Sequence, residues 1–276
     1  MKQNTIKRPS RINAIVVLTI CIVAAAAVGV TLGYEKLRSI WIEQCAVRDM
    51  RSQVSISAGR MVSAEIVAES FGLRVGANLA LIDFDEKRRE TLSRIPNIRA
   101  ISVTRHLPAR VEIVVEERIP VARMEILHQN RRHTGRVVDS EGMVFMCQRG
   151  TSTLPAIREA AAPGTPPGKR LSPRVLAALR LVERCQEREF QELGLLEIDV
   201  SRKDYLLATL GSYSRLKIAW RGMEDDTPES DARLRRQLSR LLQAMRSHMA
   251  DGAAIWNATD ESDDPRIYAD TQGRIQ

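Results

Sequence analysis

The stretch RHLPARVEIVVEERIPVAR, residues 105–123, has basic residues near both ends and an alternating apolar pattern between them. Within it, a pair of glutamates, Glu116 and Glu117, comes shortly before Pro120. Val111, Ile113 and Val115 alternate with polar residues, so one face of the predicted strand is apolar and the other is polar. Pro120 has no N–H to donate to a neighbouring strand, so it ends the strand or lies on an edge. The stretch predicts a strand of a sheet that buries one face.

The residues before this strand predict a strand, two helices and another strand. Val54 and Ile56 alternate with serines, and helical spacing follows over residues 62–68. Asp83 stands at the N-cap of a second helix, which Pro96 ends. Residues 101–104 then alternate as the first arm of a hairpin whose second arm is the opening strand. We expect a compact β-α-α-β-β unit of roughly 70 residues, with two helices on a small sheet.

The N-terminal region contains a candidate transmembrane helix. Residues 12–34 carry no charge and are rich in isoleucine, valine and leucine. At about 1.5 Å per residue this segment is long enough to cross a hydrocarbon layer of about 30 Å. A cleaved signal peptide ending near the alanines of residues 24–27 and a lipoprotein site at Cys21 are alternatives. The apolar stretch is long for the first, and Ile20 is large for the second.

The charges around the segment leave its orientation nearly balanced. Basic residues lie on both sides, but those before it cluster in a short tail, residues 1–11. A long following domain is translocated largely regardless of its charge. We therefore expect a cytoplasmic tail, a single-pass helix in the cell inner (cytoplasmic) membrane and a bulk that is periplasmic or otherwise extracytoplasmic.

One face of this helix carries small residues at every fourth position. Cys21, Ala25, Gly29 and Gly33 lie on it, and the last two form a GxxxG pattern that allows a second helix to pack closely. Glycine and alanine are also common in transmembrane helices that have no partner, so helix pairing here is a hypothesis.

A set of short motifs occurs in order along the first part of the chain. They are Gly76-Ala77-Asn78-Leu79, Ile82-Asp83, Leu92-Ser93-Arg94-Ile95-Pro96, Val103-Thr104-Arg105, Leu107-Pro108, Val111-Glu112-Ile113, Glu117-Arg118-Ile119-Pro120-Val121-Ala122, Val138-Asp139-Ser140-Glu141-Gly142-Met143-Val144-Phe145 and Leu154-Pro155. Together they resemble the POTRA domain and following segment of the bacterial cell-division proteins FtsQ and DivIB. Asn97 and Met124 stand where the family often carries aromatic residues.

The resemblance implies a POTRA domain over residues 47–118 and a second extracytoplasmic β domain over residues 119–276. It also implies a bitopic scaffold of the division complex at the septum, which links early and late division proteins. FtsQ-family proteins use a sheet edge near the end of the second domain to hold FtsB in its complex with FtsL. The matching segment is the last strand candidate, Arg266, Ile267, Tyr268 and Ala269, with Tyr268 as the expected anchor because its ring supplies contact area at low entropic cost.

The second domain is predicted from its own pattern. Residues 195–200, 205–210 and 216–220 are strand candidates, and residues 172–182 and 230–249 have the spacing of amphipathic helices. A mixed, mainly antiparallel sheet with helices against it fits this order, so the chain is of the α+β class. Residues 158–171 are rich in alanine, proline and glycine and predict a solvent-exposed connection. The arginines of the second helix predict a solvated face rather than a nucleic-acid arm.

The sequence contains no recognisable catalytic pattern. It lacks G-x-S-x-G, S-x-x-K, H-E-x-x-H and phosphate-loop motifs, and its four cysteines have no metal-ligand spacing. Glu116 and Glu117 are neighbours on a strand and point to its opposite faces, so the two carboxylates do not flank one substrate. We instead expect Glu117 and Arg118 to form ion pairs where the two domains meet. We expect no enzyme activity, metal, cofactor, small-molecule substrate or nucleic-acid partner.

Two other functions remain as alternatives. A POTRA-bearing membrane-anchored transport or outer-membrane assembly factor would need a membrane barrel or further POTRA repeats. A membrane-anchored wall hydrolase would need a nucleophile or a metal site. Pairing of the cysteines, oligomeric state and the identity of the free edge strand stay open at this point.

Overall fold

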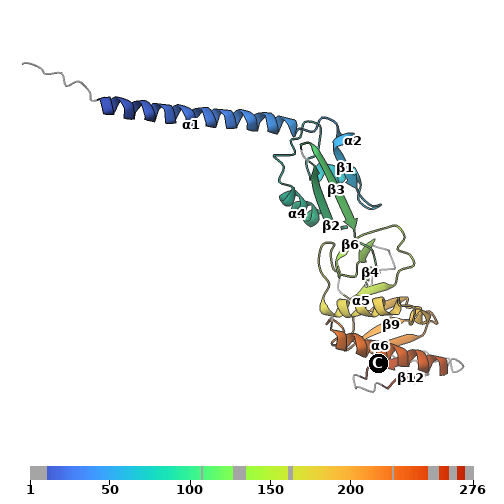
Figure 1. The fold of residues 1–276 in the computed structure, drawn as a ribbon. Helices are drawn as coiled ribbons and strands as arrows, with labels where there is room; N and C mark the ends of the chain where they lie inside the picture. Colours follow the sequence, from blue (N-terminus) through green and yellow to red (C-terminus); the bar gives the residue numbers. More distant parts are fainter. Residues whose placement is uncertain are drawn as a thin grey trace, which may run out of the picture. The chain divides into compact units, whose positions relative to one another are not determined.

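The computed structural model describes residues 11–106, 108–126, 135–160, 164–225, 227–247, 255–260 and 266–270. It is an α+β protein with an N-terminal apolar helix, a small sheet and a large mixed sheet (Figure 1). Residues 1–10 of the expected tail, Met249 of the expected second helix and residues 261–264 of an acidic loop lie outside the described residues. The chain divides into two compact units, which are described separately.

Unit 1 comprises Met1–Ser57, Ala64–Lys87 and Ser102–Val114. Its first element is helix α1 (Arg11–Gln44), whose part Leu18–Gln44 contains an 18-residue window with a mean hydropathy of 1.8 and is long and apolar enough to span a membrane. The helix continues past Tyr34, where the predicted apolar segment ends. The side-chain amide of Asn78 donates to the carbonyl of Ile42 (2.7 Å), so the last turn of α1 is tied to a loop of the same unit.

The small sheet has the element order that the sequence predicts. A short helix, α2 (Met50–Gln53), precedes β1 (Val54–Ser57), α3 (Ala64–Ser70), α4 (Phe84–Arg94), β2 (Ile98–His106) and β3 (Arg110–Glu117). The strand order is β1-β3-β2, and β1 runs parallel to β3 with Val54 opposite Val111. The carboxylate of Asp83 accepts hydrogen bonds from the N–H groups of Asp85 (3.1 Å) and Glu86 (2.9 Å), which confirms the predicted cap of α4.

Unit 2 comprises Ala58–Ser63, Arg88–Ile101 and Val115–Gln276, and its centre is a nine-stranded sheet. The strands are β4 (Ala122–Ile126), β5 (Arg136–Val138), β6 (Val144–Met146), β7 (Ala156–Glu159), β8 (Glu197–Asp199), β9 (Tyr205–Thr209), β10 (Arg215–Ala219), β11 (Ile255–Ala258) and β12 (Tyr268–Asp270). Their order across the sheet is β12-β11-β10-β9-β8-β7-β4-β5-β6. The pairs β4/β7, β7/β8 and β10/β11 are parallel and the other five are antiparallel, so the sheet is mixed and mainly antiparallel, as expected.

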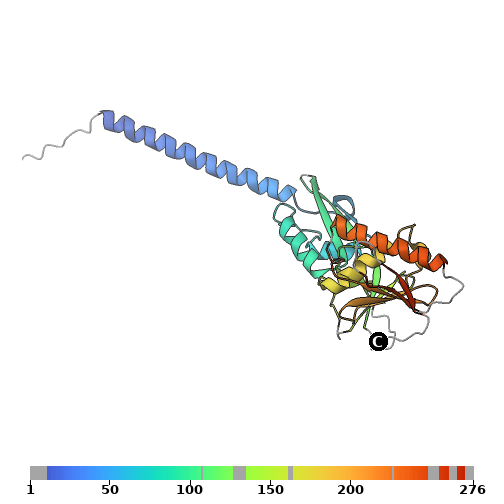
Figure 2. The ribbon, with the colours of Figure 1, turned by 90° about the horizontal axis from the view of Figure 1, so that it is seen from below.

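Two helices and the sheet enclose one aliphatic core (Figure 2). Helix α5 (Pro173–Cys185) contributes Leu179 and Val182, and α6 (Pro228–Ser247) contributes Leu234 and Leu238, all of them buried. A 3₁₀ turn, Gln191–Leu193, lies between the helices in sequence. Burial of such side chains contributes about 1.5–3 kcal/mol each, so the spacing of leucines along α6 decides which face it turns to the sheet.

The helix starts differ in detail from the sequence prediction. Pro173 occupies the first position of α5 as expected, but the side chain of Ser172 makes no cap hydrogen bond. Helix α6 begins at Pro228, before the predicted residue 230, because Thr227 caps it: the N–H of Ser230 donates to the Thr227 hydroxyl (3.2 Å).

The prediction of a solvent-exposed connection over residues 158–171 is wrong at both ends. Strand β7 extends to Glu159 and pairs with β4 and β8, and Leu171 is buried in the core. Glu159 is also buried. Its carboxylate accepts hydrogen bonds from the N–H (2.8 Å) and the hydroxyl (2.6 Å) of Thr165, which compensate for the loss of water. A four-residue strand flanked by two parallel partners shows no alternation, so its sequence gave no periodic signal.

Candidate binding edge

Strand β12 stands at one end of the nine-stranded sheet, and among the residues that the structure describes it has a hydrogen-bonded neighbour on one side, β11. It runs antiparallel to β11, with Tyr268 opposite Asn257 and Ala269 opposite Trp256. The side chain of Tyr268 is 57% exposed. Among the four predicted residues, Tyr268 and Ala269 lie in the strand, whereas Arg266 and Ile267 precede it. The segment matched through the family resemblance therefore lies at an edge of the described sheet, with bounds one to two residues too early, and its role in binding stays a prediction.

The two faces of this edge differ in polarity. Ile267 packs against the core formed with α5 and α6, next to the side of the sheet that carries the buried Trp256. Tyr268 stands on the opposite face, in a row that continues through Asn257 of β11 and Lys217 of β10. Because cross-strand neighbours share a face, the ring of Tyr268 lies beside the polar side chains of Asn257 and Lys217.

Hydrogen bonds to Asp260 hold the residues that immediately precede β12. The N–H of Arg266 donates to the Asp260 carboxylate (3.0 Å), and the amide of Gln237 in α6 donates to the Asp260 carbonyl (3.3 Å). Gln237 is itself buried. These contacts attach the start of β12 to α6, so the short strand is positioned by the helix as well as by its three-residue pairing with β11.

The opposite edge of the large sheet is β6, and other parts of the chain occupy its outward backbone groups. The N–H of Val144 donates to the carbonyl of Lys169 (3.3 Å), and the carbonyl of Val144 accepts from the N–H of Gly168 (2.8 Å). The carbonyl of Met146 accepts from the side-chain amide of Asn97 (2.7 Å). Strand β6 is thereby covered in the way that proteins protect sheet edges.

Arg118 and Glu117, which are expected from the sequence to form ion pairs where the two domains meet, both lie in unit 2 close to this covered edge. Arg118 forms ion pairs, whereas Glu117 has none among the described residues. The guanidinium of Arg118 contacts Asp139 and Glu141, with 3.0 Å to the latter. Glu117 instead accepts hydrogen bonds from three backbone N–H groups, at residues 60, 61 and 62 (3.0, 2.9 and 2.7 Å). The hydrogen bonds from Arg118 and Arg99 lower the pKa of Glu141 below its ordinary value.

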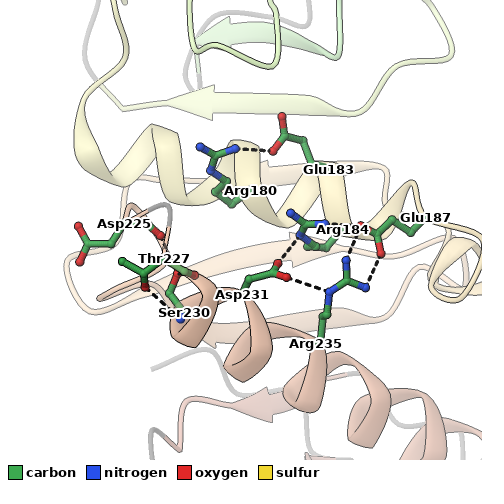
Figure 3. A network of polar contacts seen from close by, with 9 residues as sticks. All are labelled: Arg180, Glu183, Arg184, Glu187, Asp225, Thr227, Ser230, Asp231 and Arg235. Carbon is green, nitrogen blue, oxygen red and sulfur yellow. Dashed lines mark hydrogen bonds and ion pairs between the residues drawn. The ribbon is translucent and has the colours of Figure 1, made fainter.

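Two arginines of α6, Arg235 and Arg246, bind carboxylates within the protein. Arg184 of α5 and Arg235 of α6 form a closed ring with Glu187 and Asp231 (Figure 3). Arg235 lies 2.7 Å from Glu187 and 3.0 Å from Asp231. Hydrogen bonds to Asp231 and Glu187 raise the pKa of Arg235. The ring joins α5 to α6, and the interpretation of the α6 arginines as a solvated face rather than a nucleic-acid arm stays a prediction.

The part of the chain that the structure describes contains no cluster of three or more metal-binding side chains. The four cysteines are unpaired: Cys21 is exposed on α1, and Cys45, Cys147 and Cys185 are buried. Burial raises the pKa of the Cys185 thiol to about 12. A thiol held in that state is a poor nucleophile, so Cys185 behaves as a core residue.

The small residues of α1 remain a prediction. Cys21, Ala25, Gly29 and Gly33 share one face of the helix, and an added Cβ at Gly29 or Gly33 would meet no other described atom within 4 Å. This face is therefore open in the single chain, and nothing in it identifies a partner helix.

Comparison with known protein families places the small sheet in a defined class. Residues 51–118 match the family model described as "POTRA domain, FtsQ-type", which covers about a quarter of the chain. A search of curated proteins gave no match. The chain is thus an α+β protein with a membrane-compatible helix followed by a POTRA domain. The FtsQ type of that domain confirms the resemblance to the FtsQ/DivIB family of bacterial cell-division proteins.

Proposed function

We propose that this protein is a single-pass membrane scaffold of the bacterial division complex, with a cytoplasmic N-terminus, and that it binds its partners without catalysing a reaction. The FtsQ-type POTRA domain and the apolar helix α1 support the coarse part of this proposal, a membrane-anchored division protein. The finer part is that β12 receives a strand from a partner of the FtsB type, held in a complex with an FtsL-type protein.

The observation that carries the finer part is the contrast between the two ends of the large sheet. Gly168, Lys169 and Asn97 occupy outward groups of β6, whereas within the described part of the chain β12 ends the sheet with Tyr268 largely exposed. An uncovered edge strand offers backbone donors and acceptors to an incoming strand, and its side chains add selectivity. In this proposal Tyr268 is the anchor, because an exposed aromatic ring contributes a large contact area.

The test is co-purification of the full chain with an FtsB–FtsL pair from the same cells. We expect Tyr268→Ala to weaken binding and Ala269→Pro to remove most of it, because proline cannot donate to a ladder. Tyr213→Ala is the matched control, since Tyr213 is 84% exposed in the turn between β9 and β10. Full binding by Ala269→Pro would contradict strand addition at β12.

Depletion of the protein in cells tests the coarse part separately. A division scaffold predicts that the depleted cells grow as filaments. Loss of outer-membrane proteins would favour a transport or assembly factor instead, and altered wall digestion products would favour a hydrolase.

A further inference from the structure

A groove of about 840 Å³ opens in unit 2 beside the covered edge strand β6. Three short segments line it, residues 59–61, 117–120 and 146–150, together with Asn97. All of them belong to unit 2. The groove lies beyond β6, and β12 is the strand at the opposite end of the same sheet. It is therefore a surface separate from the proposed strand-addition edge.

The groove is lined by large apolar side chains, of which Met61 also packs against the buried cluster of Val137, Phe145 and Cys147. Ile119 is 78% exposed and Met146 is 40% exposed, and Met61 is half-buried between the same segments. A partner that covers these side chains would gain about 25 cal/mol of binding free energy for each square ångström of apolar surface removed from water. Contiguous apolar side chains in a concave site are typical of binding grooves.

The walls of the groove are held in place by hydrogen bonds. The carboxylate of Glu117 accepts from the N–H groups of Arg60 (3.0 Å) and Met61 (2.9 Å), and Asn97 donates to the carbonyl of Met146 (2.7 Å). The N–H of Cys147 donates to the carbonyl of Gly135 (2.8 Å). Because the walls of the groove are already fixed, few side chains and little backbone become ordered when a partner binds. Less of the binding free energy is then offset by lost conformational entropy.

The charge available at the rim is positive. Arg60 and Arg149 are exposed, whereas the single carboxylate of the lining, that of Glu117, is occupied by backbone N–H groups. The guanidinium of Arg118 is turned to Asp139 and Glu141. A ligand that fits must therefore bring apolar groups to cover Ile119 and Met146, and carboxylates to pair with the two exposed arginines.

We infer that the groove binds a segment of a partner protein in which apolar side chains are flanked by aspartate or glutamate. The apolar side chains cover Ile119 and Met146, and the carboxylates pair with Arg60 and Arg149. A phosphate polymer supplies charge without the apolar groups, and so matches only the rim. This second docking surface does not rest on strand addition at β12.

The test uses the full chain in nanodiscs of neutral lipid and two fluorescent nonapeptide probes, one of alternating leucine and glutamate and one with lysine in place of glutamate. We expect the acidic probe to bind and the basic probe to bind far more weakly. Ile119→Asp, and the double variant Arg60→Glu with Arg149→Glu, each weaken binding of the acidic probe about tenfold or more. Empty nanodiscs give the background.

Matched controls separate the groove from general charge and hydrophobicity. Leu81→Asp changes a side chain that is 71% exposed in unit 1, and Arg202→Glu changes an exposed arginine of unit 2 outside the groove. Neither is expected to change binding, and Tyr268→Ala is expected to leave it unchanged too. Thermal unfolding confirms that each variant is folded, which is expected because Ile119, Arg60 and Arg149 are exposed.

Three results would overturn the inference. They are equal binding of both probes, unchanged binding by the groove variants, and absence of binding of the acidic probe up to about 1 mM. Recruitment of the protein to anionic vesicles through Arg60 and Arg149, without binding of the acidic probe, would assign the arginines to lipid instead.

Discussion

The guanidinium of Arg118 contacts the carboxylate of Asp139 in a nearly dry environment, where the two side chains are 11% and 5% exposed. Asp139 also accepts hydrogen bonds from the N–H groups of Glu141 (3.1 Å) and Met143 (2.8 Å), which hold the turn before β6. Removing the arginine would leave a buried carboxylate without its cation, which is more costly than never having had the pair.

Arg118→Ala is therefore expected to lower the free energy of unfolding by about 3–5 kcal/mol. Arg99→Ala is the matched control, because Arg99 is 51% exposed and solvent screens its pairs with Glu116 and Glu141, so its loss is expected to change stability little. Urea unfolding of the full chain in detergent measures both. Equal effects of the two variants would contradict the importance of burial.

Glu141 is expected to make the stability depend on pH in the acid range. Its pKa in the folded protein lies below the ordinary value of 4.5, because Arg118 and Arg99 donate hydrogen bonds to the charged form. The stabilisation is thus fully present above pH 4.5 and is lost as the pH falls through the lowered pKa. Urea midpoints measured from about pH 6 to about pH 3 should fall less steeply for Glu141→Gln than for the natural chain.

The size of this pH effect should also depend on salt, since Glu141 is 47% exposed. Glu69→Gln, at an exposed position of α3, is the matched control and should leave the slope of the natural chain unchanged. A slope that stays the same for Glu141→Gln would show that another group carries the acid transition.

Gly59 and Glu117 are expected to behave as one structural unit. A Cβ built on Gly59 would lie 2.2 Å from the Glu117 carboxylate, which already binds three backbone N–H groups. Gly59→Ala displaces the carboxylate and Glu117→Ala removes it, so each should lower the free energy of unfolding by about 1–3 kcal/mol.

Because both changes release the same N–H groups, the double variant should be little worse than either single one. Thermal unfolding of the three variants measures this coupling, with Ser57→Ala at the exposed end of β1 as control. Simple addition of the two effects would contradict the shared role.

The ring that joins α5 to α6 is expected to contribute modestly. Glu187 and Arg235 are about one-third exposed, so a double-mutant cycle with alanine at both positions should give a coupling of about 0.5–1 kcal/mol that decreases as salt is added. Arg236→Ala, at an exposed position of the same helix, should change stability little. A coupling that is independent of salt would argue against an electrostatic origin.

Sequence patterns predicted the elements that have strong periodicity or clear end signals. The alternation of Val111, Ile113 and Val115 gave β3, the leucine stripe gave α6, and Asp83 gave the start of α4. Each of these features depends on residues that are close together in the sequence, so the helix or strand can be predicted without knowledge of the fold.

The features that the sequence did not give depend on contacts between distant segments. Strand β7 is four residues long and lies between two parallel partners, and the three hydrogen bonds to Glu117 come from residues more than fifty positions away. The cover over β6 likewise comes from Gly168, Lys169 and Asn97. No local pattern reports such pairings, and for this reason the sequence alone left open which edge strand is free.

The central claim is that β12 accepts a partner's strand, and amide hydrogen exchange tests it most directly. Exchange is measured on the full chain, alone and with an FtsB–FtsL pair, over peptides that cover β12 and β6. The account predicts that binding slows exchange at residues 268–270 and leaves residues 144–146 unchanged. Formation of the complex with unaltered exchange at residues 268–270 would contradict it.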